Sequence, residues 1–217
     1  MIELAAMKYS LGLDAGSASV KVVIVSDDGK VRYTDVEKIA AGPKSAIAAL
    51  MARAAGKFDL AQISTAGVTG TGAGLVPADL DCSQYSSSLA IAAGLLDRYP
   101  DARTIIQIGG QSSFVIALVD GLKKPWQVTS NPLCAAGTGR FLEQQAYRIG
   151  VTLEDFARIA LECEGSPPRI AARCSVFAKT DLIHLQQKGV PMSAMLYALC
   201  ESIARMVASL KKGEFEA

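Results

Sequence analysis

The sequence is poor in the features that mark several common functional classes. It has one histidine, a net charge of +1 and no apolar run of membrane-spanning length. Such a charge gives no electrostatic footprint for nucleic acid or an anionic membrane. The first residues lack the layout of a secretory signal, and no GxxxxGK[ST] sequence is present to form a P-loop. We therefore expect a cytoplasmic protein without nucleic-acid or membrane partners.

Cysteine is also scarce, and its spacing is irregular. The five cysteines include no CxxC pair, which argues against a secreted disulfide framework. Cys134 and Cys174 each precede a predicted helix start, where free N–H groups stabilise thiolates and an anionic iron–sulfur cluster. Two thiolates are fewer than the four that a cubane cluster needs, and a twofold dimer would supply the other pair. Simple burial is the alternative, and it is our prediction for Cys200 on the apolar last helix.

A strand–turn–strand unit occurs twice in the chain. Asp14 and Gln107, at the two turns, are 93 residues apart. This duplication predicts an α/β fold of two lobes, 8–100 and 101–217, with a nucleotide in the cleft. Helices are predicted from about residue 139 onward. The remaining predicted elements are strands at Tyr9–Leu13, Val20–Val25, Val31–Ile39, Gln62–Val68, Thr104–Ile108, Phe114–Val119 and Trp126–Thr129, and helices at Pro43–Ala55 and Ser87–Tyr99.

Both turns are built from residues suited to binding phosphate. Tight turns of Gly and Ser present consecutive backbone N–H groups, which form a concave anion site. Asp14, beside Gly16 and Ser17, adds a carboxylate suited to hydrated Mg²⁺, and Lys21 could reach a phosphate. Taken alone, this segment is equally an ordinary hairpin. The second turn, at 109–112, favours the functional interpretation because it occurs in the same context.

These motifs resemble known families. Gly12-Leu-Asp-Ala-Gly-Ser17 with Lys21, and Ile106-Gln-Ile-Gly-Gly-Gln111, are similar to the phosphate motifs of the actin, Hsp70 and sugar-kinase superfamily, which has a ribonuclease H-like fold. The segments Cys134-Ala-Ala-Gly-Thr-Gly-Arg-Phe and Cys174-Ser-Val-Phe resemble the BadF/BadG/BcrA/BcrD family. That family comprises activators of 2-hydroxyacyl-CoA dehydratases and benzoyl-CoA reductases.

The resemblance implies a complete set of cofactors and partners. Cys134 and Cys174 would ligate one 4Fe-4S cluster shared by the two subunits of a homodimer. ATP or ADP and Mg²⁺ would bind in the clefts, a ferredoxin or flavodoxin would donate electrons, and an iron–sulfur acyl-CoA dehydratase or reductase would accept them. The implied binding residues are Asp14, Gly16, Ser17 and Lys21 at the first turn, Gly109, Gly110 and Gln111 at the second, and Gly137, Thr138 and Gly139 in the cluster segment.

The sequence departs from the family pattern in several places. The family has an acidic residue at the position of Gln107, an aspartate at Ser112, and Val-Thr-Gly-Tyr-Gly-Arg where this chain has Val68-Thr-Gly-Thr-Gly-Ala73. Its Gly-Gly-Val-Ala region, which contacts adenosine, has no counterpart before Ala217. Asp14 and Gln107 are the catalytic candidates. An amide is not a useful base, so we expect weak or absent ATPase activity from this chain alone.

Two further expectations follow from these departures. The chain would be a fragment or truncated member with an incomplete second lobe, and its terminal helix, Met192–Lys212, would expose apolar surface. A degenerate actin-like nucleotide-binding or regulatory module without ATPase activity remains the alternative function. A small-molecule kinase of the same superfamily is a third.

Overall fold

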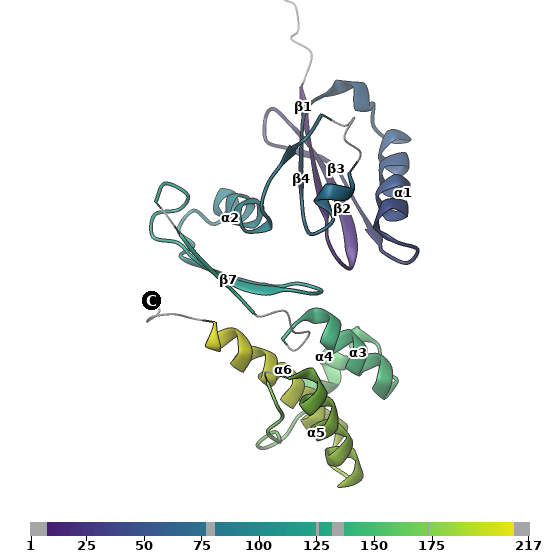
Figure 1. Cartoon of the computed structure of the whole chain (residues 1–217), viewed down its shortest axis with the longest axis vertical. Coiled ribbons are helices and arrows are strands. Elements are labelled where there is room, and N and C mark those ends of the chain that lie inside the picture. Colours follow the sequence, from purple (N-terminus) through teal and green to yellow (C-terminus); the bar gives the residue numbers. More distant parts are fainter. Residues whose placement is uncertain (1–7, 77–80, 125, 132–136, 173, 211–217) are drawn as a thin grey trace, which may run out of the picture. The chain divides into compact units, whose positions relative to one another are not determined.

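The computed structural model describes residues 8–76, 81–124, 126–131, 137–172 and 174–210 (Figure 1). The chain divides into two compact units, Met1–Gly94 and Leu95–Ala217. The boundary falls inside α2 (Ser87–Arg98). Across the described residues, no helix is both long and apolar enough to cross a membrane.

The first unit is a five-stranded sheet in the order β3-β2-β1-β4-β5. The predicted meander is present: β1 and β2 are antiparallel, as are β2 and β3, while β4 runs parallel to β1. The two-residue strand β5, which pairs with β4, was not predicted. The strands are β1 (Tyr9–Ala15), β2 (Ser19–Ser26), β3 (Val31–Lys38), β4 (Ile63–Thr69) and β5 (Ser83–Gln84), with short 3₁₀ turns at Leu60–Gln62 and Ala73–Leu75.

One face of this sheet is covered by α1 (Pro43–Ala55), as Figure 1 shows. Successive residues of a strand point to opposite faces. In β1 and β2 the buried positions Leu13, Ala15, Val20 and Val22 therefore share one face, where they pack with Ile47 and neighbouring α1 side chains. The alternate positions of these strands are left on the opposite face. Those positions include Asp14 and Lys21 of the predicted phosphate site.

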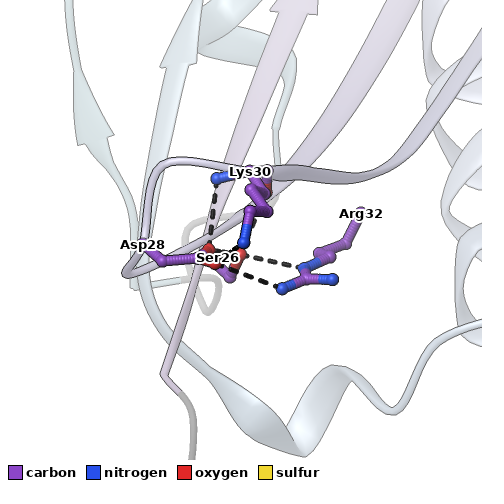
Figure 2. Close-up of polar contacts among 4 residues, drawn as sticks. All are labelled: Ser26, Asp28, Lys30 and Arg32. Carbon is purple, nitrogen blue, oxygen red and sulfur yellow. Dashed lines mark hydrogen bonds and ion pairs between the residues drawn. The ribbon is translucent and has the colours of Figure 1, made fainter.

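The turn between β2 and β3 is closed by a polar cluster (Figure 2). Ser26 donates to Asp28, whose carboxylate also pairs with the Lys30 ammonium at 2.8 Å. Arg32 donates through Nε to the Ser26 hydroxyl at 2.9 Å. Gly29 supplies the positive φ of +78° that the turn requires. The Lys30 and Ser26 contacts hold the pKa of Asp28 well below its usual range, so the carboxylate stays charged in the turn.

The second unit combines a three-stranded antiparallel sheet with four further helices. The strands β6 (Thr104–Ile108), β7 (Ser113–Ala117) and β8 (Gln127–Ser130) lie in that order, which confirms the second meander. The helices α3 (Gly139–Ile149), α4 (Leu153–Leu161), α5 (Ser175–Gln187) and α6 (Met192–Ser209) confirm the helical region after 139. Thr152 caps α4, because its hydroxyl accepts from the Asp155 amide at 3.0 Å.

The last helix differs from its predicted state. We expected α6 to expose apolar surface, but most of its apolar side chains are buried in the core of this unit, with Leu196 and Leu199 at 0% exposure. Met192 and Tyr197 remain exposed, at 40% and 41%. Cys200, expected in that core, is exposed instead. The residue follows Leu199 by one position, and one step along a helix turns a side chain by roughly 100°. Partial burial of its thiol nevertheless raises the pKa of Cys200.

A test of the first unit concerns the attachment of α1 to β3. Arg53 donates to Asp35 and to Glu37, both at 2.7 Å, and the Arg53 guanidinium lowers the pKa of Asp35 to about 2. Stabilisation by such a carboxylate is present above its unfolded pKa, near 4, and is lost as pH falls through about 2. We expect Arg53→Met to lower the melting temperature at pH 7 by roughly 2–4 °C, with the difference closing near pH 2.

The control for this test is Arg158→Met. Arg158 pairs with Asp155 and Glu162 within one exposed helix, so its removal should change the melting temperature little. Equal losses for both variants, or a loss from Arg53→Met that persists at pH 2, would contradict the assignment.

Candidate functional site

The first turn connects β1 to β2 and carries an ion pair. The Gly16 amide donates to the Ser19 carbonyl at 3.1 Å and closes the turn. A Cβ on Gly16 would lie 2.8 Å from that carbonyl oxygen, so the tight closure requires glycine. Asp14 and Lys21 are direct partners across the two strands, and their side chains pair at 2.9 Å. Both remain partly exposed, with side-chain accessibilities of 39% and 52% respectively.

The glycine-rich segment 70–74 packs against this turn. The Gly72 amide donates to the Ala15 carbonyl at 2.8 Å. Gly70 has φ +95°, and a Cβ there would lie 2.3 Å from the Ala15 oxygen and 2.7 Å from Asp14 Oδ1. The segment thus lies directly against the Asp14 carboxylate. In the sequence most of this segment stood out only as a departure from the family pattern, and its contact with the turn was not predicted.

Asp14 and Lys21 face a hollow on the side of the sheet away from α1. The hollow has a volume of about 730 Å³, and its lining also includes Thr69 at the end of β4. Thr69 is the parallel neighbour of Asp14 and donates to Ser87 Oγ at 3.5 Å. The first turn therefore combines a carboxylate, an ammonium and a hydroxyl beside an open concave surface. Such a set can bind a phosphate together with a hydrated divalent cation.

The second turn repeats the backbone of the first. The Gly109 amide donates to the Ser112 carbonyl at 2.8 Å, and a Cβ on Gly109 would approach that oxygen to 2.8 Å. Gln107 pairs with Phe114 across the strands, in the register that Asp14 and Lys21 have in the first unit. The predicted duplication therefore extends to the hydrogen bond that closes each turn.

The two turns differ in their side-chain chemistry. Where the first has a charged pair, the second has the neutral amide of Gln107 and the buried ring of Phe114, which is 9% exposed. Gln107 Nε2 lies 3.5 Å, and Ser112 Oγ 3.9 Å, from the Cβ position of Gly109. Both side chains therefore lie over this turn, but they provide hydrogen bonds and no charge. Of the residue pairs that flank the two turns, Asp14–Lys21 is charged and Gln107–Phe114 is not.

Three of the predicted cluster-segment residues lie against the second turn. The start of α3 is fastened to it, because the amides of Gly139 and Arg140 donate to the carbonyls of Gly109 and Gly110 at 2.9 and 3.1 Å. The Gly137 carbonyl accepts from Ser113 Oγ at 2.7 Å. Gly137, Thr138 and Gly139 thus build the support of the turn, and Thr138 is fully buried. Ser113, which the sequence did not single out, holds this segment from the first residue of β7.

The two predicted cluster ligands differ in how they can be described. Cys134 lies outside the described residues. Cys174 is partly buried and occupies the N-cap of α5, as predicted, with its carbonyl accepting from the Ala178 amide at 3.0 Å. No group of three or more His, Cys, Asp or Glu side chains in the described ranges gathers in a way that could hold a metal ion. The described part of one chain therefore offers a single thiol at a helix N-terminus, a chemistry that fits one ligand of a shared cluster.

The duplicated strand–turn–strand units, each closed by the same glycine hydrogen bond and followed by helices, define a protein of the actin-like class. The comparison with known families is specific within that class. The chain belongs to the BadF/BadG/BcrA/BcrD ATPase family, whose model matches residues 11–216. This confirms the resemblance carried by the turn and cysteine motifs.

Several of the similar proteins are activators of acyl-CoA dehydratases. The activator of lactoyl-CoA dehydratase from Anaerotignum propionicum is 34% identical over 93% of this chain and 77% of its own length. Component A of the Acidaminococcus fermentans (R)-2-hydroxyglutaryl-CoA dehydratase matches with a TM-score of 0.82 and 28% identity, over 94% of this chain and 77% of that one. The activator of the 2-hydroxyisocaproyl-CoA dehydratase from Clostridium difficile, solved with bound ADPNP, gives 0.80 and 28%, over 93% and 74%.

The asymmetry of the turns generates a test on Gln107. An amide can hold a water molecule but cannot accept its proton at neutral pH. We expect Gln107→Asp to raise the rate of Mg²⁺–ATP hydrolysis, within the roughly hundred- to ten-thousand-fold range that a general base contributes. Phosphate release would be measured under saturating nucleotide.

The matched control is Gln107→Asn, which shortens the side chain equally but keeps an amide, and it should leave the rate at the parent level. Fast hydrolysis by the unmodified chain, or an equal gain in both variants, would show that another group polarises the water.

Proposed function

We propose that this protein is an ATP-dependent activator that transfers low-potential electrons from an iron–sulfur cluster to an acyl-CoA dehydratase or reductase. The observation that carries the proposal is the Asp14–Lys21 pair over the Gly16 turn, within a chain that belongs to an ATPase family. Asp14 would hold the Mg²⁺ of the nucleotide through water, while Lys21 and the turn would bind phosphate. The relative with bound ADPNP supports a nucleotide at this kind of site.

Cys134 and Cys174 would hold a 4Fe-4S cluster together with the same residues of a second subunit. When bound, the cluster would supply the electron that the partner receives. Cys174 suits this role because it occupies the N-cap of α5, and a helix N-terminus favours negatively charged groups. An electron donor of the ferredoxin or flavodoxin type would reload the cluster, and a dehydratase like those named for the relatives would be the acceptor.

The side chains that follow Cys174 support assembly into a homodimer. Val176 and Phe177 are 66% and 65% exposed on the first turn of α5. Large apolar side chains that remain exposed beside a candidate ligand favour burial by another protein surface. A second copy of the chain would bury them and bring its own pair of thiolates to the same place.

Nucleotide would act by favouring one arrangement of the dimer over another. A ligand can shift such an equilibrium only if it binds the two arrangements with different affinity. In this proposal, contact of the phosphates with the first turn provides that difference. The backbone hydrogen bonds from the start of α3 to the second turn connect this turn directly to the cluster segment.

A second function is favoured by one observation, the replacement of the charged pair by Gln107 and Phe114 in the second turn. A turn without charge suits a nucleotide-binding or regulatory module that does not hydrolyse ATP. An ATPase assay with and without an acyl-CoA dehydratase distinguishes the two functions. Turnover that depends on the dehydratase supports the activator, whereas nucleotide binding without turnover supports the module.

The cluster is tested by anaerobic purification with iron and sulfide analysis. We expect brown protein containing about four irons per dimer. Cys134→Ala or Cys174→Ala should abolish both the colour and the iron, because each variant removes two of the four thiolates from the dimer. Cys200→Ala is the matched control and should retain the cluster, since this exposed residue lies on a different helix. Iron retained after loss of either Cys134 or Cys174 would contradict the proposed ligand set.

The dimer is tested separately through Phe177. We expect Phe177→Glu to shift the mass measured by light scattering from dimer toward monomer, because carboxylates in an apolar contact are costly to desolvate. Tyr147→Glu is the control, since Tyr147 is also highly exposed, at 89%, but lies on α3. A dimer that tolerates Phe177→Glu but not Tyr147→Glu would place the interface elsewhere.

A further inference from the structure

The segment that leads into Cys174 is held at one peptide group. The carbonyl of Ile170 accepts from Arg205 Nη2 at 3.0 Å. The amide of Ala171 donates to Asp181 Oδ2 at 2.9 Å. These two atoms belong to the same peptide bond, in which the carbonyl and the N–H point in opposite directions. Two side chains of opposite charge, Arg205 and Asp181, therefore hydrogen-bond to opposite edges of this peptide group.

The two side chains that bind this peptide group come from different helices. Asp181 lies on α5, the helix that Cys174 caps, and Arg205 lies on α6. Arg205 is itself held by Glu201, one turn earlier on α6, at 2.8 Å. The Arg205 side chain is 30% exposed, so its hydrogen bond to the Ile170 carbonyl is partly shielded from water. Hydrogen bonds in which one partner is charged are stronger than neutral ones.

The Ile170 side chain also anchors this peptide group, by packing into the apolar core. It is 3% exposed and belongs to the apolar core formed with α6. Cys174 follows Ala171 by three positions and caps α5, the helix that carries Asp181. Through its bond to the Ala171 amide, Asp181 connects this residue to α5, the helix that Cys174 caps.

We propose that Asp181 and Arg205 are positioning residues that set the place of the Cys174 thiol by fixing the Ile170–Ala171 peptide group. The value of this arrangement to a shared cluster rests on the function proposed above. The positioning itself is a property of the chain and can be measured without a cluster.

The test is the rate at which iodoacetamide alkylates each cysteine in metal-free, reduced protein of the full 217 residues. Mass spectrometry of the digested peptides gives a separate rate constant for Cys174. We expect Asp181→Ala to raise this rate about tenfold, since loss of a charged hydrogen-bond partner increases local opening by an amount of that order. Asp181→Asn should stay near the parent rate, because its amide oxygen can still accept from the Ala171 amide.

Arg205 provides the second pair of variants. Arg205→Met should raise the Cys174 rate in the same way, whereas Arg205→Lys keeps a charged donor and should restore much of the protection. This pair carries the comparison if Asp181→Ala fails to fold. Cys82, in the first unit, and Cys200, on α6, serve as internal references in the Asp181 variants. Arg158→Met is the matched control for removal of an arginine from the same unit.

The outcomes separate positioning from general stability. A rise confined to Cys174, and reversed by the Asn and Lys variants, supports the proposal. No change at Cys174 in folded Asp181→Ala and Arg205→Met, or an equal rise at Cys200, overturns it. Absence of iron from the unmodified protein would end the proposed electron transfer and leave the alkylation result valid, so the two failures are distinguishable.

Discussion

The structure depends on a hydrogen bond that spans three residues and is used twice. In each unit the first glycine after a strand donates to a carbonyl three positions later, and the chain reverses directly into the next strand. The closeness of that carbonyl excludes any side chain at the donor position. With the reversal fixed, the two strands pair in one register, and the residues before and after the turn face each other. The site is therefore a consequence of the turn rather than an addition to it.

The surroundings of the two turns have diverged more than their backbones. In the first unit the glycine-rich segment 70–74 supports the turn through Ala15, and the sheet face that bears Asp14 remains open over the hollow. In the second unit α3 begins on the turn itself, and its amides are engaged by the carbonyls of Gly109 and Gly110. One turn is thus arranged around a site for a ligand, while the other is built into a support that connects strands to helices.

The sequence predicted most of the local structure, because the signals were short-range. Helix Pro43–Ala55 and both meanders follow from propensity, alternation and turn chemistry, which neighbouring residues determine. The superfamily motifs also located the two turns correctly. What the sequence could not predict depends on contacts between distant segments. Gly70 against Ala15, Ser113 on Gly137, and the Asp181 and Arg205 contacts join residues with no shared pattern.

The errors have the same physical origin. Cys200 lies in an apolar helix, and composition alone placed it in the core, yet rotation along the helix turns it outward between buried neighbours. The apolar stripe of α6 was expected to be uncovered, and it instead forms the centre of the second unit's core. Periodicity identifies which residues share a face, but not what lies against that face.

The burial of Phe114 makes the divergence of the two halves hard to reverse. An ammonium at that position, the counterpart of Lys21, would have to enter an apolar environment at a high desolvation cost. A carboxylate introduced at position 107 would consequently have no cation across the strands, whereas Asp14 has Lys21. Packing therefore keeps a charged pair out of the second turn, because the cation would be buried and the carboxylate would have no partner across the strands.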